Sequence, residues 1–237
     1  MKTVKFDGGN VKLIAHRGLS SMETENTIEA FVAAANRNYW GIETDVHVTK
    51  DGKFVVFHDD STERMTGKKL VVEKTSYKKL SKLVMDNNGI KSRIPLFEEY
   101  LAVCKKYGKK AVVELKNEFN SEDIKKLIKI IEKVNYIANV LFISFHFDNL
   151  IKVRTILPTQ DVQFLTGTFS EDLLEKLRKN NFGIDIKYTE LNEKNIAELK
   201  KKDILINCWT CDKPQKAAVL AALGVNYITT NILQNEK

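Results

Sequence analysis

The sequence is poor in cysteine and proline and has no long hydrophobic segment. Its 237 residues include three cysteines and three prolines. An odd, low number of cysteines excludes a disulfide-rich scaffold and favours a reducing compartment, so we expect a cytoplasmic protein. The first residues, MKTVKFDGGNVK, lack the apolar core of a secretion signal. The longest apolar run, AAVLAALGV, is far shorter than the roughly 20 residues of a membrane span, so no span is expected.

The charge of the chain bears on its partners. The net charge is +7, which suggests an anionic partner. However, the lysines recur in helix-like stretches such as DIKKLIKIIEKV, where they would form solvated faces. No RNA- or DNA-binding motif accompanies them, so we expect no nucleic-acid partner.

Short β-branched or apolar runs alternate with amphipathic segments along the chain. The strand candidates are residues 12–16, 41–48, 110–115, 140–145, 162–166, 182–188, 204–209 and 227–230. The predicted helices are 27–38, 95–107, 122–134, 148–157, 170–180, 192–201 and 214–223. Eight strands separated by helices are typical of a parallel sheet, and their number favours a (β/α)8 TIM barrel. No linker divides the chain, so we predict a single domain over residues 1–237.

One strand candidate, KFVVFH at 53–58, does not fit this alternation. It follows the strand 41–48 after a short turn containing Asp-Gly, which is a hairpin signal. We therefore predict antiparallel pairing of 53–58 with 41–48, and a small insertion over about 59–94. After the eighth strand only NILQNEK remains, so the last outer helix is expected to be absent or rudimentary.

Polar residues at strand ends indicate where the chemistry takes place. In a barrel of this kind the active site forms at the C-terminal ends of the strands. His16 and Arg17 end the first predicted strand, and Gly18 permits a sharp turn there. Asn26 and Glu29 have the spacing of a capping box, so we expect Asn26 to cap the first helix.

Three carboxylates predict a metal site. Glu43 and Asp45 are two residues apart, so their side chains share one face of a buried strand. Two such carboxylates repel each other, and a divalent cation is the usual compensation. Glu114 ends the next barrel strand and supplies a third acid. We therefore expect these side chains to bind one divalent cation, Mg²⁺ or Ca²⁺.

Histidines and basic side chains complete the predicted site. His58 ends the hairpin strand and would form an acid–base pair with His16 beside the metal. Arg17 and Lys116 add positive charge that suits a phosphate. Together these groups favour phosphoryl chemistry. His47 lies on the same strand face as two of the acids, and both the cavity and the loop remain open as its location.

The ordered set of these motifs resembles the glycerophosphodiester phosphodiesterases. Their pattern consists of HRG, ENT at a helix start, E-x-D-V-x-x-T-K-D-G, HD and E-x-K. These motifs are found here at residues 16–18, 25–27, 43–52, 58–59 and 114–116. The segments IPLFEEYL, INCWT and ALGVNYITTN are also similar to the family, so the resemblance spans nearly the whole chain.

The resemblance implies a TIM barrel with an insertion after its second strand. By the same resemblance, His16 and His58 match the catalytic histidines of the family. The positions that match its metal ligands are Glu43, Asp45 and Glu114.

Other matches concern the substrate, and two positions depart from the family pattern. Arg17 and Lys116 match phosphate contacts, and Trp209 matches an aromatic residue at the pocket wall. Thr24 stands where the family usually has proline, and Asn231 stands where aspartate is common. Asparagine retains the hydrogen-bonding shape of aspartate but lacks its charge.

The resemblance implies hydrolysis of small glycerophosphodiesters to glycerol 3-phosphate and an alcohol. The glycerol 2-hydroxyl would attack phosphorus to form a cyclic phosphate, which water would then open. We favour His16 as the base and His58 as the acid, an order that the sequence alone leaves open.

Two other functions are considered. A phospholipase-type member of the same superfamily would act on lysolipids, but the lysine-rich segment 59–94 offers no sustained apolar surface for acyl chains. A non-catalytic module would bind anions, but it would not need two histidines beside three acids.

Cys208 and Cys211 form a C-x-x-C motif without the further ligands of a zinc set. We expect Cys208 to face the helices, because Trp209 takes the barrel side.

Overall fold

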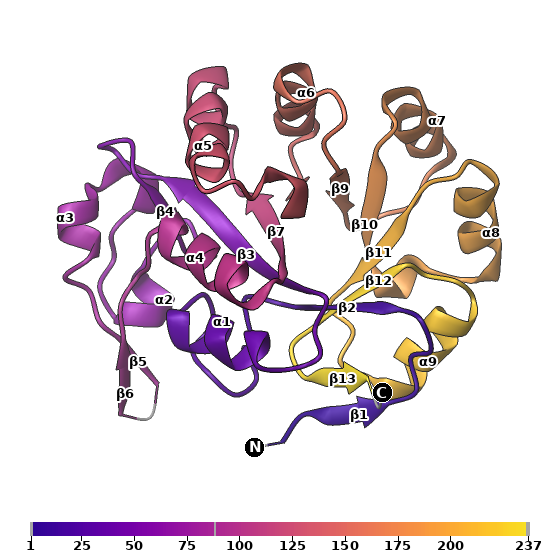
Figure 1. The fold of residues 1–237 in the computed structure, drawn as a ribbon, viewed down its shortest axis with the longest axis horizontal. Helices are drawn as coiled ribbons and strands as arrows, with labels where there is room; N and C mark the ends of the chain where they lie inside the picture. Colours follow the sequence, from indigo (N-terminus) through magenta and orange to yellow (C-terminus); the bar gives the residue numbers. More distant parts are fainter. Residues whose placement is uncertain (1, 88, 236–237) are drawn as a thin grey trace.

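The computed structural model describes residues 2–87 and 89–235, and its centre is a closed barrel of parallel strands (Figure 1). The ring contains, in chain order, β2 (Lys12–Ala15), β3 (Gly41–Val48), β7 (Lys110–Leu115), β8 (Val140–Ser144), β9 (Val162–Thr166), β10 (Gly183–Lys187), β11 (Ile206–Trp209) and β12 (Tyr227–Thr230). Pairing of β2 with β12 on one side and with β3 on the other closes the ring. The predicted TIM barrel is confirmed.

Helices lie between the strands and cover the outside of the barrel. They are α1 (Ile28–Ala35), α4 (Phe97–Tyr107), α5 (Ser121–Lys133), α6 (Phe147–Ile156), α7 (Glu171–Asn180), α8 (Glu193–Lys201) and α9 (Pro214–Ala222), with short 3-10 turns η2 (Ile137–Asn139) and η3 (Tyr188–Glu190). Each of these α-helices follows a predicted helix to within a few residues at its ends. None of the helices in the described ranges is long and apolar enough to cross a membrane.

The helix α5 shows why these segments fold as they do. Its buried residues recur with the spacing of one helix face: Ile124, Leu127, Ile128 and Ile131. The side chain of Asn120 accepts a hydrogen bond from the backbone of Asp123 and so caps the first turn. The lysines of this helix lie on the opposite, solvated face, as the sequence predicts.

The strands alternate between two cores. In β10, Ile184 and Ile186 are fully buried in the hydrophobic core between the strands and the helices, so Asp185 faces the barrel interior. In β11, Cys208 lies in the same outer core and Trp209 packs with the residues inside the barrel. The predicted facing of Cys208 is therefore confirmed, and this alternation decides which side chains reach the site.

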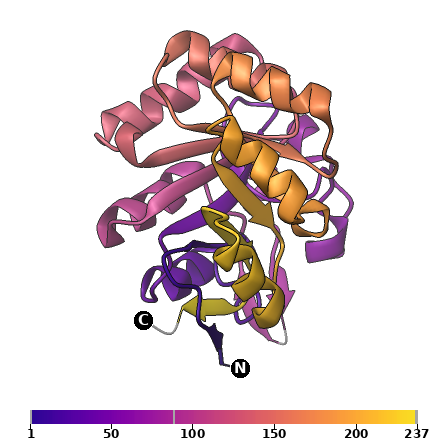
Figure 2. The same cartoon turned by 90° about the vertical axis from the view of Figure 1, so that its right-hand side faces the viewer.

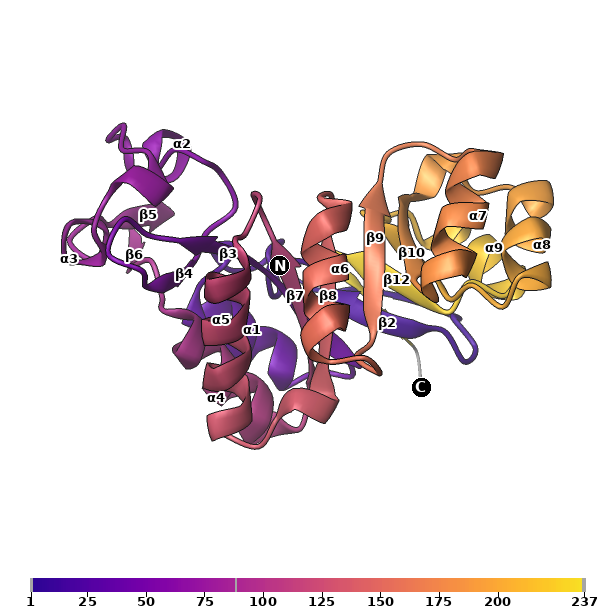
Figure 3. The same cartoon turned by 90° about the horizontal axis from the view of Figure 1, so that it is seen from above.

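The segment after β3 forms a separate group of short elements beside the barrel, seen at one end of the molecule in Figure 3. The strand β4 (Phe54–Val56) pairs antiparallel with β3, as predicted. It is followed by α2 (Glu63–Thr66), η1 (Val72–Lys74), α3 (Tyr77–Leu80), β5 (Met85–Asn87) and β6 (Ile90–Ser92). Buried side chains that include Phe57, Val72 and Leu80 form a small core of their own.

The strands nearest the two ends of the chain lie side by side below the barrel, in the lower part of Figure 2. The strand β1 (Val4–Phe6) pairs in parallel with β13 (Leu233–Asn235), which follows β12. The sequence did not predict this pair, because three residues are too few to show an alternating pattern. Within the described residues no helix follows β12, in agreement with the prediction for the end of the chain.

Candidate active site

Three carboxylates converge at the C-terminal ends of β3 and β7. Glu43 and Asp45 project from the same face of β3, and Asp45 lies beside Glu114 in the register of β3 with β7. One oxygen from each side chain lies within 4.8 Å of the others, and all three residues are buried. The structure thus brings together the three acids that the sequence assigned to a metal.

The electrostatics of this cluster require positive charge. Burial, reinforced by Asp45 and Glu114, raises the pKa of Glu43 well above its usual value. Burial and the neighbouring Asp45 raise the pKa of Glu114 to about 7. Burial also opposes ionisation of Asp45, but Lys116 and Arg17 outweigh it and hold the pKa of Asp45 below its usual range. Two of the three acids are therefore difficult to ionise.

If all three acids are ionised, their ion pairs leave one negative charge without compensation. Lys116 Nζ lies 3.2 Å from Asp45 Oδ1 and 2.9 Å from Glu114 Oε1. Arg17 Nε lies 3.5 Å from Asp45 Oδ2. Two basic side chains thus face three carboxylates, and the donor set consists of hard oxygen atoms. A divalent cation such as Mg²⁺ or Ca²⁺ fits this arrangement.

The turn after β2 presents Arg17 toward the acids. Arg17 adopts a left-handed backbone with φ of 55°, and its N–H donates to Glu43 Oε2 at 2.8 Å. Gly18 follows with φ of 77°, and a Cβ at this position would lie 2.7 Å from the backbone carbon of Ala30. Gly18 is therefore required here, because the loop after β2 approaches α1 too closely for any side chain.

His16 is held by an amide. Its Nδ1 lies 2.8 Å from Oδ1 of Asn231, which also accepts a hydrogen bond from Ser20 Oγ at 2.8 Å. Burial, followed by the charge of Arg17, lowers the pKa of His16 to about 4. His16 is therefore a neutral imidazole near pH 7. Because Nδ1 carries the hydrogen that Asn231 accepts, Nε2 is the basic nitrogen.

The orientation of Asn231 is decided by Asp212. Oδ2 of Asp212 accepts a hydrogen bond from Asn231 Nδ2 at 2.6 Å, and its Oδ1 accepts from the backbone N–H of Asn231 at 2.7 Å. Thr230 Oγ1 also donates to Asp212 Oδ1, at 2.8 Å. Because the carboxylate of Asp212 accepts from the amide nitrogen, the amide oxygen must face His16.

His58 is held by a carboxylate. Its Nδ1 lies 2.6 Å from Asp59 Oδ1, and Arg64 Nε donates to Asp59 Oδ2 at 2.6 Å. Arg64 also donates to Glu25 at 2.6 Å, and Glu25 accepts from Arg17 at 2.9 Å. The two loops that carry the histidines are thus joined by ion pairs. Burial lowers the pKa of His58, while the charge of Asp45 and the hydrogen bond to Asp59 oppose that shift.

These groups line one cavity of about 250 Å³ at the C-terminal end of the barrel. We call the lining residues from β2, β3, β4, β7 and the loops after them the near wall: His16, Arg17, Glu43, His58, Glu114 and Lys116. The lining residues from β8 to β12 and the loop after β8 are the far wall: Ile143, Phe145, Leu165, Asp185, Trp209 and Thr229. Trp209 Nε1 donates to the backbone oxygen of Asp185 at 3.1 Å, and the Phe145 ring meets the Trp209 ring edge-on at 5.7 Å. Phe145 is 44% exposed and lies at this cavity.

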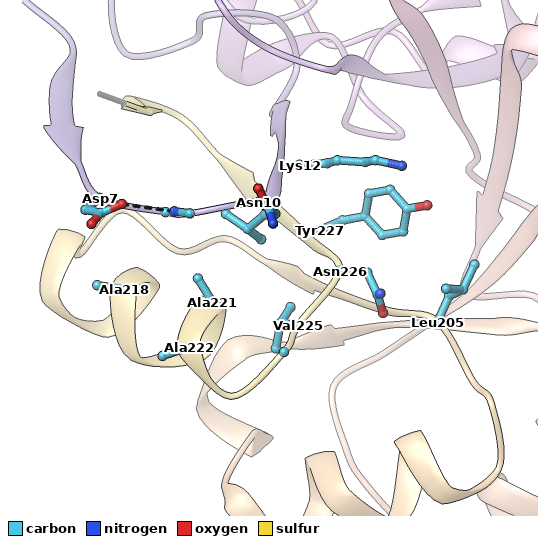
Figure 4. A pocket seen from close by; sticks show the side chains of 14 residues that line it. Asp7, Asn10, Lys12, Leu205, Ala218, Ala221, Ala222, Val225, Asn226 and Tyr227 are labelled. Atoms are coloured by element: carbon cyan, nitrogen blue, oxygen red, sulfur yellow. Dashed lines mark hydrogen bonds between the residues drawn. The ribbon is translucent and has the colours of Figure 1, made fainter. Parts of the chain in front are cut away.

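A larger cavity of about 570 Å³ lies at the opposite end of the barrel, between the chain before β2 and α9 (Figure 4). Its charged side chains Asp7 and Lys12 make contacts with neighbouring groups. Asp7 accepts a hydrogen bond from the backbone of Gly9 at 3.1 Å, and Lys12 Nζ lies 5.5 Å from the centre of the Tyr227 ring. No histidine or cluster of acids lines it among the described residues, so it lacks the groups that the smaller cavity brings together.

The structure decides the location of His47, which the sequence left open, and shows that the predicted role of Asn26 is wrong. His47 points away from the cavity, since its Nδ1 lies 3.1 Å from Glu73 Oε1 beneath the segment after β4. Asn26 does not cap α1, because Thr27 accepts the capping hydrogen bond from Ala30. Instead Asn26 Nδ2 donates to Asp45 Oδ2 at 2.7 Å. Asn26 and Thr27 are both common capping residues, and the spacing to Glu29 favoured the wrong one.

Other functional residues were missed by the sequence analysis. Asp212, Glu25 and Arg64 act on the histidines and on Arg17 through contacts between different loops. Asp185 was missed although the alternation of β10 between Ile184 and Ile186 places it inside the barrel. That alternation was a signal that could have identified it.

Several known proteins are similar to this chain. The model of the glycerophosphoryl diester phosphodiesterase family matches residues 16–234. YhdW of Bacillus subtilis strain 168, provisionally named a glycerophosphodiester phosphodiesterase, is 32% identical over 92% of this chain and 93% of its own. A glycerophosphodiester phosphodiesterase of Caldanaerobacter subterraneus is 29% identical over 92% and 93% of the two chains. The structure of an Oleispira antarctica phosphodiesterase in complex with sn-glycerol-3-phosphate has a TM-score of 0.86 at 22% identity, covering 93% of each chain.

Proposed function

The chain belongs to the glycerophosphoryl diester phosphodiesterase family, and we propose that it hydrolyses small glycerophosphodiesters to glycerol 3-phosphate and an alcohol in the 250 Å³ cavity. One observation carries this proposal: two histidines, two basic side chains and two acids, Glu43 and Glu114, line that cavity, and Asp45 lies beside these acids in the same cluster. The sn-glycerol-3-phosphate bound by the Oleispira antarctica phosphodiesterase is the product that this reaction releases.

Glu43, Asp45 and Glu114 would hold one divalent cation, Mg²⁺ or Ca²⁺. When bound, this cation would offset negative charge on the phosphate and acidify a substrate hydroxyl. The fit rests on the three converging carboxylates and on the raised pKa values of Glu43 and Glu114, which a cation would lower.

The two histidines have different partners, and this difference supports different roles for them. His16 has an amide partner and a low pKa, so its Nε2 is free to accept a proton near pH 7. His58 has the carboxylate of Asp59 at its Nδ1, which opposes the lowering of the His58 pKa by burial and would stabilise its protonated form. These contacts support the proposal that His16 acts as the base and His58 as the acid.

The reaction then follows from proximity. His16 Nε2 takes the proton of the glycerol 2-hydroxyl, and the hydroxyl oxygen attacks phosphorus to close a five-membered ring. The bond between phosphorus and the alcohol oxygen breaks, and His58 gives its proton to that oxygen. Water then opens the cyclic phosphate, and the histidines act in reversed roles. Arg17 and Lys116 bind the phosphate and offset its growing negative charge.

Assays of glycerophosphocholine hydrolysis test this proposal. The protein is freed of metal by chelation and then supplied with Mg²⁺, Ca²⁺ or Mn²⁺ in turn. We expect no turnover after chelation and restored turnover with at least one ion. Full activity after exhaustive chelation would contradict metal dependence, and failure of every glycerophosphodiester in a head-group panel would contradict the assigned substrate. Faster turnover of lysophosphatidylcholine would favour the lysolipid alternative.

A further inference from the structure

Asp185 is a buried carboxyl group that the proposed reaction does not use. It is 1% exposed, it faces the barrel interior from β10, and it lines the cavity. Its Oδ1 has no hydrogen-bond partner in the described part of the protein. Leaving a buried polar atom without a hydrogen bond costs free energy, and most buried polar atoms are therefore paired. The unpaired oxygen of Asp185 thus points to a ligand that supplies the bond.

The other polar side chains inside this part of the barrel are paired with one another. Asn207 Nδ2 donates to Gln163 Oε1 at 3.2 Å, and Thr229 Oγ1 donates to Asn207 Oδ1 at 3.3 Å. Asp185 takes no part in this chain of hydrogen bonds, although its strand lies between those of Gln163 and Asn207. The contrast indicates that Asp185 is not a structural member of the barrel interior.

Asp185 lies across the cavity from the reacting groups. In the closed ring β10 is diametrically opposite β3, which carries Glu43 and Asp45. Apart from Asp185 and Thr229, the far wall consists of the apolar or aromatic residues Ile143, Phe145, Leu165 and Trp209. A ligand that spans the cavity would therefore meet one strong hydrogen-bonding side chain at its far end.

We propose that Asp185 binds the terminal hydroxyl of the glycerol moiety and so makes the site select glycerol esters. This inference rests on the proposed function. The phosphate and the 2-hydroxyl must lie between His16, His58 and the acids on the near wall. The terminal hydroxyl sits on the carbon beyond the 2-hydroxyl, and it extends toward the far wall.

The chemistry of Asp185 suits a hydroxyl better than a cationic head group. Burial, together with the charge of Glu114, raises the pKa of Asp185 well above its usual value. A carboxyl oxygen without a partner can accept a hydrogen bond from an alcohol in either protonation state, and the protonated form can also donate one. A leaving alcohol must also reach solvent, and the exposed Phe145 marks the outer part of the cavity. The fully buried Asp185 is at the inner part.

The test compares glycerophosphocholine with its analogue in which the terminal CH₂OH is CH₃ and the 2-hydroxyl is kept. We expect the unaltered enzyme to prefer the parent by about 10²-fold in kcat/KM, because loss of the hydroxyl leaves the buried Asp185 without its hydrogen-bond partner. Asp185→Leu should reduce the rate with the parent to that of the analogue and leave the analogue unchanged. Asp185→Asn retains a donor and an acceptor, and it should keep most of the preference. Asp161→Leu, at the opposite end of the barrel, is the control and should change neither rate.

A second readout does not depend on turnover. Calorimetry should show that sn-glycerol 3-phosphate binds more tightly than 2-hydroxypropyl phosphate, and that Asp185→Leu removes the difference. An equal loss for both substrates in Asp185→Leu would show a structural role and overturn the proposal. A changed preference between choline and glycerol head groups, with hydroxyl selectivity retained, would also overturn it. If the unaltered protein hydrolyses neither substrate, the proposed function fails, and the binding difference alone decides the role of Asp185.

Discussion

Nδ1 of His16 donates a hydrogen bond to the amide oxygen of Asn231 across 2.8 Å, and Asp212 lies directly behind that amide. The sequence resembles a family in which aspartate is common at position 231. In this protein the neutral amide of Asn231 contacts His16, and the carboxylate of Asp212 contacts that amide instead of the histidine.

This relationship predicts the effect of Asn231→Asp. The new carboxylate would raise the pKa of His16, so the acidic limb of kcat/KM should move to higher pH. It would also face Asp212 where Asn231 Nδ2 now lies 2.6 Å away, and the repulsion should lower the melting temperature. Adding Asp212→Asn should restore the melting temperature but not the pH profile. An unchanged profile in Asn231→Asp would show that the partner of Nδ1 does not set the basicity of His16.

The histidines are expected to act in turnover and not in folding. His16→Ala and His58→Ala should each lower kcat by about 10²- to 10⁴-fold, the range for a lost general base or acid. Both should retain the melting temperature of the parent to within a few degrees. His146→Ala is a matched control, because His146 is not among the residues that line the cavity. Near-normal turnover in either of the first two variants would remove that histidine from the mechanism.

The acid cluster predicts how metal and pH affect stability. The folded-state pKa of Glu43 is raised, and that of Glu114 is raised from 4.5 to about 7, so these two carboxyl groups bind more protons in the folded protein than in the unfolded chain. Through these two groups the metal-free protein should lose stability as the pH rises from about 4.5 through 7, whereas His16, whose pKa is lowered from 6.5 to about 4, contributes in the opposite direction below pH 6.5. Added divalent cation should raise the melting temperature more at pH 8 than at pH 5. An equal effect at both pH values would contradict binding at these carboxylates. Glu43→Gln should weaken the effect.

The HRG turn predicts a difference between two glycines. Gly18→Ala would combine a left-handed backbone with a Cβ 2.7 Å from Ala30, and it should cost about 2–4 kcal/mol of unfolding free energy together with most activity. Gly52→Ala meets only the backbone strain, since nothing lies within 4 Å of its Cβ, and it should cost about 1 kcal/mol. Urea denaturation measures both. Equal costs would show that the contact with α1 is not what requires Gly18.

The sequence alone was sufficient for the barrel and for the groups at its strand ends. Alternation within a strand is a local property, so the spacing of Glu43 and Asp45 already placed both carboxylates on one face. Helix periodicity is equally local, and α5 follows it residue by residue. The HRG and HD motifs likewise placed His16 and His58 beside the acids, because strand ends meet at one end of a parallel barrel.

Contacts between distant loops depended on the closed structure. Asn231 lies 215 residues from His16 in the chain, and Asp212 acts through it from a third loop. The position of Asp185 opposite the acids follows from the closure of the ring, which no local pattern encodes. His47 shares a strand face with Glu43, yet β3 extends past the barrel and places it under the neighbouring segment. Local periodicity assigns a side chain to a face, and only the packing of all eight strands decides what that face meets.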